Sequence, residues 1–152
     1  MDMQIQHILV PMDFSPDAEQ ALEHAVALAQ QFQARITLLH AIHLPVTTEV
    51  VLTGYFSEMA ASAEHGMETY QKRVADAGLS VETLVLVGDP FRQIIETATD
   101  KGADLIVMGT HGRTGMQHWM LGSVAERVVR LAPCPVLVTR KTHAADAETL
   151  QA

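Results

Sequence analysis

The sequence predicts an α/β protein built on an open, doubly wound parallel sheet with helices on both faces. Three observations lead to this prediction. Five apolar runs of strand length alternate with four helical patterns along the 152 residues. The runs are rich in branched side chains and show little polar alternation, which is typical of parallel strands buried on both faces. Helical connections between successive strands also imply right-handed crossovers and parallel pairing.

Two prolines mark the first strand and the first helix. Residues 5–10 form a short branched run that ends at Pro11 and predicts the first strand. The first helix is expected to begin where the Ser15 hydroxyl can cap it and where Pro16 can occupy its first position. Apolar residues then recur at helical spacing as far as Phe32, which gives the helix one apolar stripe for the core.

The second and third strands enclose a longer helix. Residues 36–42 predict the second strand, and residues 43–53 read as an irregular connection because they carry a proline. A second helix is expected over about 55–77, since apolar residues gather on one face of this stretch. Gly78 is well placed as the C′ residue that ends the helix. Residues 81–87 then predict the third strand.

The third helix repeats the start signal of the first. Asp89 supplies a capping carboxylate and Pro90 a first-turn proline, and the apolar stripe that follows ends near Gly102. Residues 104–108 are again branched and apolar, and they predict the fourth strand. This strand leads into the part of the chain that bears most directly on function.

The last helix and strand complete the predicted domain. Ser123 and Glu126 have the spacing of a capping box, in which each side chain bonds a backbone donor at the other end of the first turn. Residues 136–139 predict the fifth strand. Residues 1–140 are therefore expected to form one domain, followed by a polar C-terminal tail over 141–152.

Composition restricts the class of partner. Ten basic residues against eighteen acidic ones give a net charge of −8, which argues against nucleic acid or an anionic membrane as a partner. No apolar run approaches the roughly 18–20 residues that span a bilayer. The N-terminus lacks the basic region of a signal peptide, and a single cysteine cannot form an internal disulfide. A reducing cytoplasm is the expected location.

A glycine-containing loop follows the fourth predicted strand. It contains Gly109, Gly112 and, after nine further residues, Gly122 and Ser123. Glycine tolerates positive φ and lets backbone N–H groups approach a ligand closely. The helix that follows adds unpaired N–H donors and the positive end of its dipole. The spacing does not fit the GxxxxGK[ST] or GxGxxG loops. The chemistry nevertheless indicates anion recognition, with nucleotide phosphates as the leading ligand.

Ligands of doubly wound sheets bind beyond the carboxyl ends of the strands, where the strand order reverses. The loops 11–15 and 109–123 follow the first and fourth strands, so they border one crevice if these strands are neighbours. Asp13 either contacts the nucleotide or caps local donors. Arg113 either reaches a polyphosphate or lies in solvent. His111 is interpreted as loop structure or a ribose-phosphate contact, because none of the eight histidines has the spacing of a zinc site.

Ordered motifs extend this pattern over residues 5–140. The glycine loop fits G-x2-G-x9-G-[ST]. It is accompanied by HILVPMDFS (7–15), LHAI (39–42), VGDP (87–90), MGTHGR (108–113) and PVLV (135–138). In these motifs the chain resembles the universal stress protein family, in its ATP-binding branch.

The resemblance implies the strand order 3-2-1-4-5, the adenine-nucleotide alpha-hydrolase-like arrangement, in which the first and fourth strands are neighbours. It implies ATP as the ligand, with ADP and AMP as alternatives, and Mg²⁺ or Mn²⁺ bound through the phosphates. The implied contacts are Pro11, Met12, Asp13 and Ala41 for adenine, Met108, Gly109 and His111 for ribose, and Gly112, Gly122, Ser123 and Val124 for phosphates. The family often has a bulkier aliphatic residue in place of Ala41, and valine or threonine in place of Met12, so these two positions affect adenine packing.

Three functions follow as hypotheses. The first is an ATP-binding stress-response or signalling module whose occupancy changes partner contacts. The second is a slow ATPase or autophosphorylating enzyme, although the chain lacks an evident set of groups for fast phosphoryl transfer. The third is a nucleotide-free structural dimer, which the intact glycine pattern disfavours. The resemblance also implies a homodimer through the fifth strand, 136–139, whose place at the sheet edge leaves backbone groups unpaired.

Overall fold

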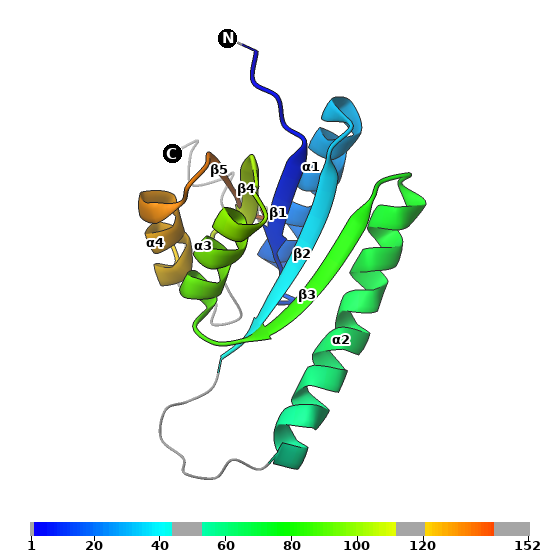
Figure 1. The fold of residues 1–152 in the computed structure, drawn as a ribbon, viewed down its shortest axis with the longest axis vertical. Helices are drawn as coiled ribbons and strands as arrows, with labels where there is room; N and C mark the ends of the chain where they lie inside the picture. Colours follow the sequence, from blue (N-terminus) through cyan, green and yellow to red (C-terminus); the bar gives the residue numbers. More distant parts are fainter. Residues whose placement is uncertain (1, 44–52, 112–120, 142–152) are drawn as a thin grey trace, which may run out of the picture.

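The computed structural model describes residues 2–43, 53–111 and 121–141. In this part of the chain five strands and four helices alternate (Figure 1). In order they are β1 (His7–Pro11), α1 (Pro16–Phe32), β2 (Arg35–Ile42), α2 (Thr53–Asp76), β3 (Val81–Val87), α3 (Pro90–Asp100), β4 (Leu105–Gly109), α4 (Ser123–Leu131) and β5 (Val136–Thr139). Residues 44–52 of the predicted connection after the second strand and residues 142–152 of the predicted tail lie outside the described residues. No described helix has the length and apolar character needed to cross a membrane.

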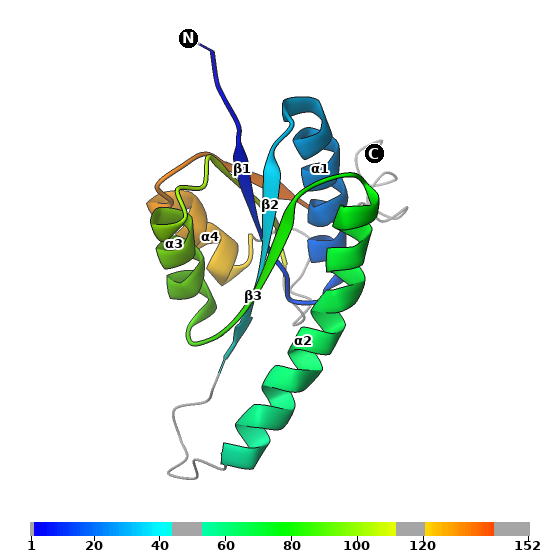
Figure 2. The same cartoon turned by 45° about the vertical axis from the view of Figure 1, so that its right-hand side comes forward.

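The strands form one parallel sheet in the order β3-β2-β1-β4-β5. This confirms the predicted fold class and strand order. α1 and α2 cover one face of the sheet, and α3 and α4 cover the other (Figure 2). Because β1 and β4 are neighbours at the centre, the loops that leave their carboxyl ends lie next to each other.

The sheet separates two apolar cores, because alternate residues of each strand point to opposite faces. On the face covered by α1 and α2, Ile8 packs in one cluster with Leu22. On the face covered by α3 and α4, Leu9 packs with Ile94 and Val128. All five side chains are buried, so both helix layers are fixed to the sheet beside the ends of its central strands.

Side chains cap α1 and α3 as predicted. The Ser15 hydroxyl accepts a hydrogen bond from the Ala18 N–H at 3.2 Å, and the Asp89 carboxylate accepts one from the Arg92 N–H at 3.1 Å. Each helix has proline in its first turn. These caps fix the points at which the loops after β1 and β3 turn into helices.

The predicted capping box at Ser123 is wrong. α4 begins at Ser123 itself, Gly122 occupies the N-cap position, and no side chain caps the helix. The reason is a backbone contact, in which the Gly122 N–H donates to the Thr110 carbonyl at 2.8 Å. The Gly122 carbonyl then accepts from the Glu126 N–H at 2.9 Å and closes the first turn. Ser123 therefore lies one residue inside the helix, with its side chain exposed.

β1 also begins two residues later than predicted. Ile5 is buried in the core, but the strand starts at His7. The N–H groups of Gln6 and His7 donate to the Asp104 carboxylate at 2.9 and 3.0 Å. A side chain thus satisfies these donors in place of a backbone carbonyl of a neighbouring strand.

Candidate functional site

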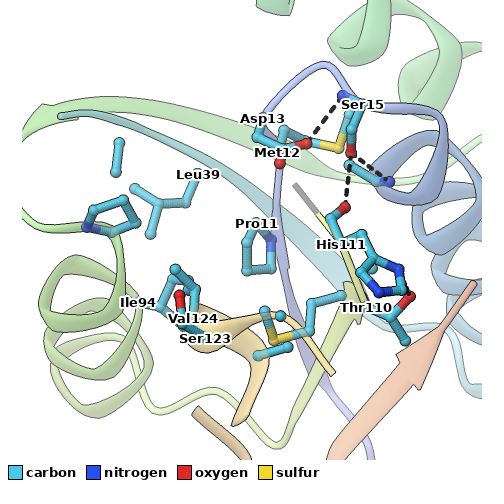
Figure 3. A pocket seen from close by; sticks show the side chains of 17 residues that line it. Pro11, Met12, Asp13, Ser15, Leu39, Ile94, Thr110, His111, Ser123 and Val124 are labelled. Atoms are coloured by element: carbon cyan, nitrogen blue, oxygen red, sulfur yellow. Dashed lines mark hydrogen bonds between the residues drawn. The ribbon is translucent and has the colours of Figure 1, made fainter. Parts of the chain in front are cut away.

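A cleft opens at the carboxyl ends of β1 and β4, where the strand order reverses (Figure 3). Its volume is about 210 Å³. The predicted contacts that line it are Pro11, Met12, Asp13, Ala41, Met108, Gly109, His111, Gly122, Ser123 and Val124. The remaining two, Gly112 and Arg113, lie outside the described residues. The described residues of the two loops that were predicted to border one crevice therefore do so.

Part of the cleft is an apolar slot. Met12 and Met108, near the ends of β1 and β4, are 2% and 5% exposed. Leu39 from β2 and Ile94 from α3 also line it, and Ala41 contributes only a methyl group. Closely packed apolar walls of this kind accommodate a flat ring and exclude water from it.

Asp13 brings a carboxylate to this slot. Its Oδ1 accepts a hydrogen bond from the Ser15 N–H at 2.9 Å, while its Oδ2 has no hydrogen-bond partner among the described residues. The Ser15 hydroxyl donates to the His111 carbonyl at 3.4 Å, which ties the loop after β1 to the loop after β4. Asp13 thus caps a local donor, as one predicted alternative has it, and still keeps an oxygen for a ligand.

A strained residue holds Asp13 in place. Phe14 has φ of 64°, a left-handed conformation that is costly for a side chain of this size. Its ring packs against the His40 ring with centroids 4.6 Å apart, and it lies so close to Gly66 that a Cβ there would approach it to 3.0 Å. His40 in turn donates from Nδ1 to the Met12 carbonyl at 2.7 Å. These contacts fix the backbone on both sides of Asp13.

Gly109 and Gly122 serve close backbone approach and not unusual backbone angles. Neither has a positive φ, so of the two properties of glycine named above only close approach applies to them. A Cβ at Gly109 would lie 2.8 Å from the carbonyl carbon of Asp17, and one at Gly122 would lie 2.6 Å from the Thr110 carbonyl oxygen. Any side chain at either position would push apart the segments that form the cleft.

The N-terminus of α4 borders the same cleft. Ser123, Val124 and Ala125 line it, and their N–H groups precede that of Glu126, which bonds the Gly122 carbonyl. The amides of the first helical turn have no helical carbonyl to bond, so they and the helix dipole favour an anion. The described lining contains no lysine or arginine. The backbone N–H groups at the start of α4 are therefore available to bind an anion in this cleft.

Some of the lining could not be read from the sequence. Ser15 and Thr110 adjoin predicted contacts, but the sequence marks Ser15 only as a helix cap and gives Thr110 no distinct signal. Leu39, Pro90 and Ile94 reach the cleft because β2 and α3 flank it in the folded sheet. No group of three or more histidine, cysteine or carboxylate side chains in the described ranges is arranged to hold a metal ion.

The family is shown by comparison with known proteins. A model of the universal stress protein family matches residues 4–140. The chain belongs to the universal stress protein family. Universal stress protein MJ0531 of Methanocaldococcus jannaschii is 36% identical to it over 138 residues, which cover 88% of this chain and 81% of the relative. Universal stress protein MJ0577 of the same organism is 31% identical over 161 residues, which cover 94% of this chain and 99% of the relative.

Solved universal stress proteins have the same fold. UspA from Lactobacillus plantarum superposes with a TM-score of 0.82 at 32% identity, over 91% of this chain and 100% of that one. Two more distant structures contain nucleotides. One is in complex with cAMP (24% identity, TM-score 0.71), and one from Archaeoglobus fulgidus is in complex with dAMP (21% identity, TM-score 0.67). Each covers 91% of this chain and 99% of its own. At these identities the likeness to this universal stress protein is one of fold.

Proposed function

We propose that this universal stress protein binds an adenine nucleotide, with ATP as the expected ligand, in the cleft between β1 and β4. One observation carries the proposal. Residues 11–13 and 122–124, far apart in the sequence, border a single cleft that combines an apolar slot with a helix N-terminus. The cAMP and dAMP complexes of two proteins with this fold support an adenine nucleotide as the ligand class.

The adenine ring is proposed to lie in the apolar slot against Pro11, Met12 and Ala41. Asp13 then provides specificity, because its Oδ2 has no partner among the described residues and can accept a hydrogen bond from the exocyclic amine of adenine. Guanine has a carbonyl oxygen at the corresponding position. Two acceptors would face each other, and such a mismatch disfavours binding.

The ribose is proposed to contact Met108, Gly109 and His111, and the phosphates to contact Gly122, Ser123 and Val124. Gly112 and Arg113 remain proposed contacts from the same loop. The described lining carries no cationic side chain, which supports Mg²⁺ or Mn²⁺ as the counter-charge to the phosphates. The metal would then enter with the nucleotide, on phosphate oxygens and water.

The proposed role is that of a binding module, in which nucleotide occupancy changes contacts with partners in a stress response. Fast phosphoryl transfer needs a positioned water, a charge-stabilising group and usually a carboxylate-held Mg²⁺. Within the described lining, Asp13 is the sole carboxylate, and its Oδ1 is already engaged with Ser15. We therefore expect slow turnover at most.

A homodimer through β5 is part of the proposal. Among the described strands β5 pairs only with β4, so its outer edge presents N–H and C=O groups to a second copy. Leu137 in this strand is a large apolar side chain that is 38% exposed. Antiparallel pairing of two such edges about a two-fold axis is self-complementary. We place the dimer in the cytoplasm, consistent with a single cysteine.

The nucleotide content of the purified protein tests this function. Bound nucleotide would be extracted, identified by chromatography and followed over time, and the emptied protein would be titrated calorimetrically with ATP, ADP, AMP and GTP. Retention of unchanged ATP, and preference for adenine over guanine, support the binding module. Steady conversion to ADP would favour the slow enzyme. Failure to bind any nucleotide would favour the structural dimer.

A further inference from the structure

Asp17, in the first turn of α1, is not among the residues that line the cleft. Its carboxylate nevertheless holds two segments that matter for function. Oδ2 accepts hydrogen bonds from the Thr110 hydroxyl at 2.8 Å and from the His111 N–H at 3.2 Å. Oδ1 accepts one from the N–H of Lys141 at 3.1 Å. One side chain therefore connects the loop after β4 with Lys141, two residues after the end of edge strand β5.

The Asp17 contacts leave the loop little freedom. Because the Thr110 hydroxyl donates its hydrogen bond to Asp17, its oxygen can accept one from His111 Nδ1 at 2.9 Å. His111 Nδ1 also lies 3.4 Å from Asp17 Oδ2. Gly109 adds close packing, since even a Cβ there would meet the backbone and the Cβ of Asp17 at 2.8 Å. A shift of Thr110 or His111 must therefore move the carboxylate.

Both oxygens of Asp17 act purely as acceptors while the group is ionised, whereas protonation would turn one of them into a donor. Burial by itself would raise the pKa of Asp17, but hydrogen bonds from the Lys141 backbone, the Thr110 hydroxyl and His111 outweigh that effect. The pKa consequently lies below its ordinary value, and the group is a carboxylate at neutral pH. The Asp17 side chain is 14% exposed, so solvent offers it little alternative hydrogen bonding.

A second contact joins the same two segments. The Thr110 N–H donates to the Thr139 carbonyl at 2.9 Å, which continues the pairing of β4 with β5 up to the cleft. Thr110 is thus bonded to the end of β5 directly and to the following chain through Asp17. Residues that line the cleft and residues at the end of the edge strand share one hydrogen-bond network.

We propose that Asp17 couples nucleotide occupancy of the cleft to the end of edge strand β5 and the chain that leaves it at Lys141. This inference rests on the proposed nucleotide binding. Contact of the nucleotide with His111 and its neighbours fixes Oδ2 in place, and the same rigid carboxylate then holds the Lys141 N–H on Oδ1. Coupling is reciprocal, so any partner that orders the end of β5 strengthens nucleotide binding by the same factor. Asp17 acts as a positioning residue, because it does not line the nucleotide cleft and acts only through the residues that it bonds.

An amide in place of the carboxylate separates the two halves of the network. Asn presents one acceptor oxygen and one NH₂ group. With its oxygen toward Thr110 and His111, the side chain satisfies two donors, whereas the opposite orientation satisfies one. Asp17→Asn should therefore keep the loop contacts and lose the bond to Lys141. Asp17→Ala removes both. Glu23→Gln is the matched control, since it removes the same charge from an exposed position of the same helix.

The test is residue-resolved amide hydrogen exchange at Lys141, with and without saturating Mg²⁺–ATP, with ATP affinity measured by calorimetry on the same samples. In the wild type and in Glu23→Gln, ATP should slow this exchange by about tenfold, a typical size for coupling between sites. Asp17→Asn should still bind ATP but show no slowing at Lys141. Equal slowing in Asp17→Asn, or bound ATP without slowing in the wild type, would overturn the coupling alone. Absence of ATP binding by the wild type would instead refute the proposed function and the coupling with it.

Discussion

Replacing Gly122 by alanine places one methyl group against the backbone of Thr110, at the border of the cleft. The new Cβ would lie 2.6 Å from the Thr110 carbonyl oxygen, whereas ordinary contacts begin at 3.4 Å. Either the start of α4 or Thr110 must therefore move by the difference, 0.8 Å. The 2.8 Å hydrogen bond from the Gly122 N–H to the same oxygen cannot survive this movement with its present geometry.

Two effects should follow, one on the stability of the fold and one on ATP binding. An unpaired donor and acceptor cost about 1–3 kcal/mol, and each kcal/mol lowers the Tm of a domain of this size by about 2–4 °C. The amides at the start of α4 also leave their positions against the phosphates. A hydrogen bond to a charged group contributes about 1.5–3 kcal/mol. Loss of one such bond should weaken ATP binding at least about tenfold, since 1.4 kcal/mol corresponds to a factor of ten.

Calorimetric titration with Mg²⁺–ATP, well below the Tm of the variant, measures this effect. Gly54→Ala is the matched control, because a Cβ at this position in α2 meets nothing within 4 Å. The control should bind ATP as the wild type does. Wild-type affinity in a folded Gly122→Ala variant would refute the assignment of the phosphates to the start of α4.

The edge strand, a buried histidine and turnover give three further expectations. Leu137→Lys should convert the dimer to a monomer in light scattering while the cleft still binds ATP, and a variant that stays dimeric would contradict pairing through β5. His7 is buried, its Nδ1 donates to the Lys101 carbonyl (3.2 Å), its Nε2 accepts from the Thr37 hydroxyl (2.7 Å), and burial lowers its pKa below 6.5. As the pH falls, the unfolded chain therefore binds a proton at His7 before the folded chain does. The free energy of unfolding should fall as the pH drops below 6.5, and it should fall less steeply in His7→Gln. Equal slopes of wild type and variant in urea unfolding would refute this. ATP hydrolysis should stay well below about 1 s⁻¹, and turnover near that rate that is abolished by Asp13→Ala would indicate an enzyme.

Features that depend on a few consecutive residues could be predicted from the sequence. The caps at Ser15 and Asp89 bond N–H groups three residues away, so the residue types alone indicate them. The alternation of strands and helices depends in the same way on local periodicity. The strand order came from the resemblance of ordered motifs, and it then placed the loops after β1 and β4 at one cleft.

Features that depend on distant contacts could not be predicted. Ser123 has the spacing of a capping box, but the bond between Gly122 and Thr110 shifts the cap by one residue. Asp17 reads as an ordinary acid in a first helical turn. Its partners Thr110 and Lys141 lie 93 and 124 residues further along the chain, and nothing local marks them. Such contacts exist only once the sheet has brought the ends of β4 and β5 beside α1.

Backbone amide NMR during titration of the wild-type protein with Mg²⁺–ATP tests the central claim most directly. The account predicts saturable shifts of the amides of residues 12–13 and 122–125, at the two ends of the proposed nucleotide, and much weaker effects of GTP. Unchanged spectra at saturating ATP, or shifts that cluster away from the carboxyl ends of β1 and β4, would contradict it.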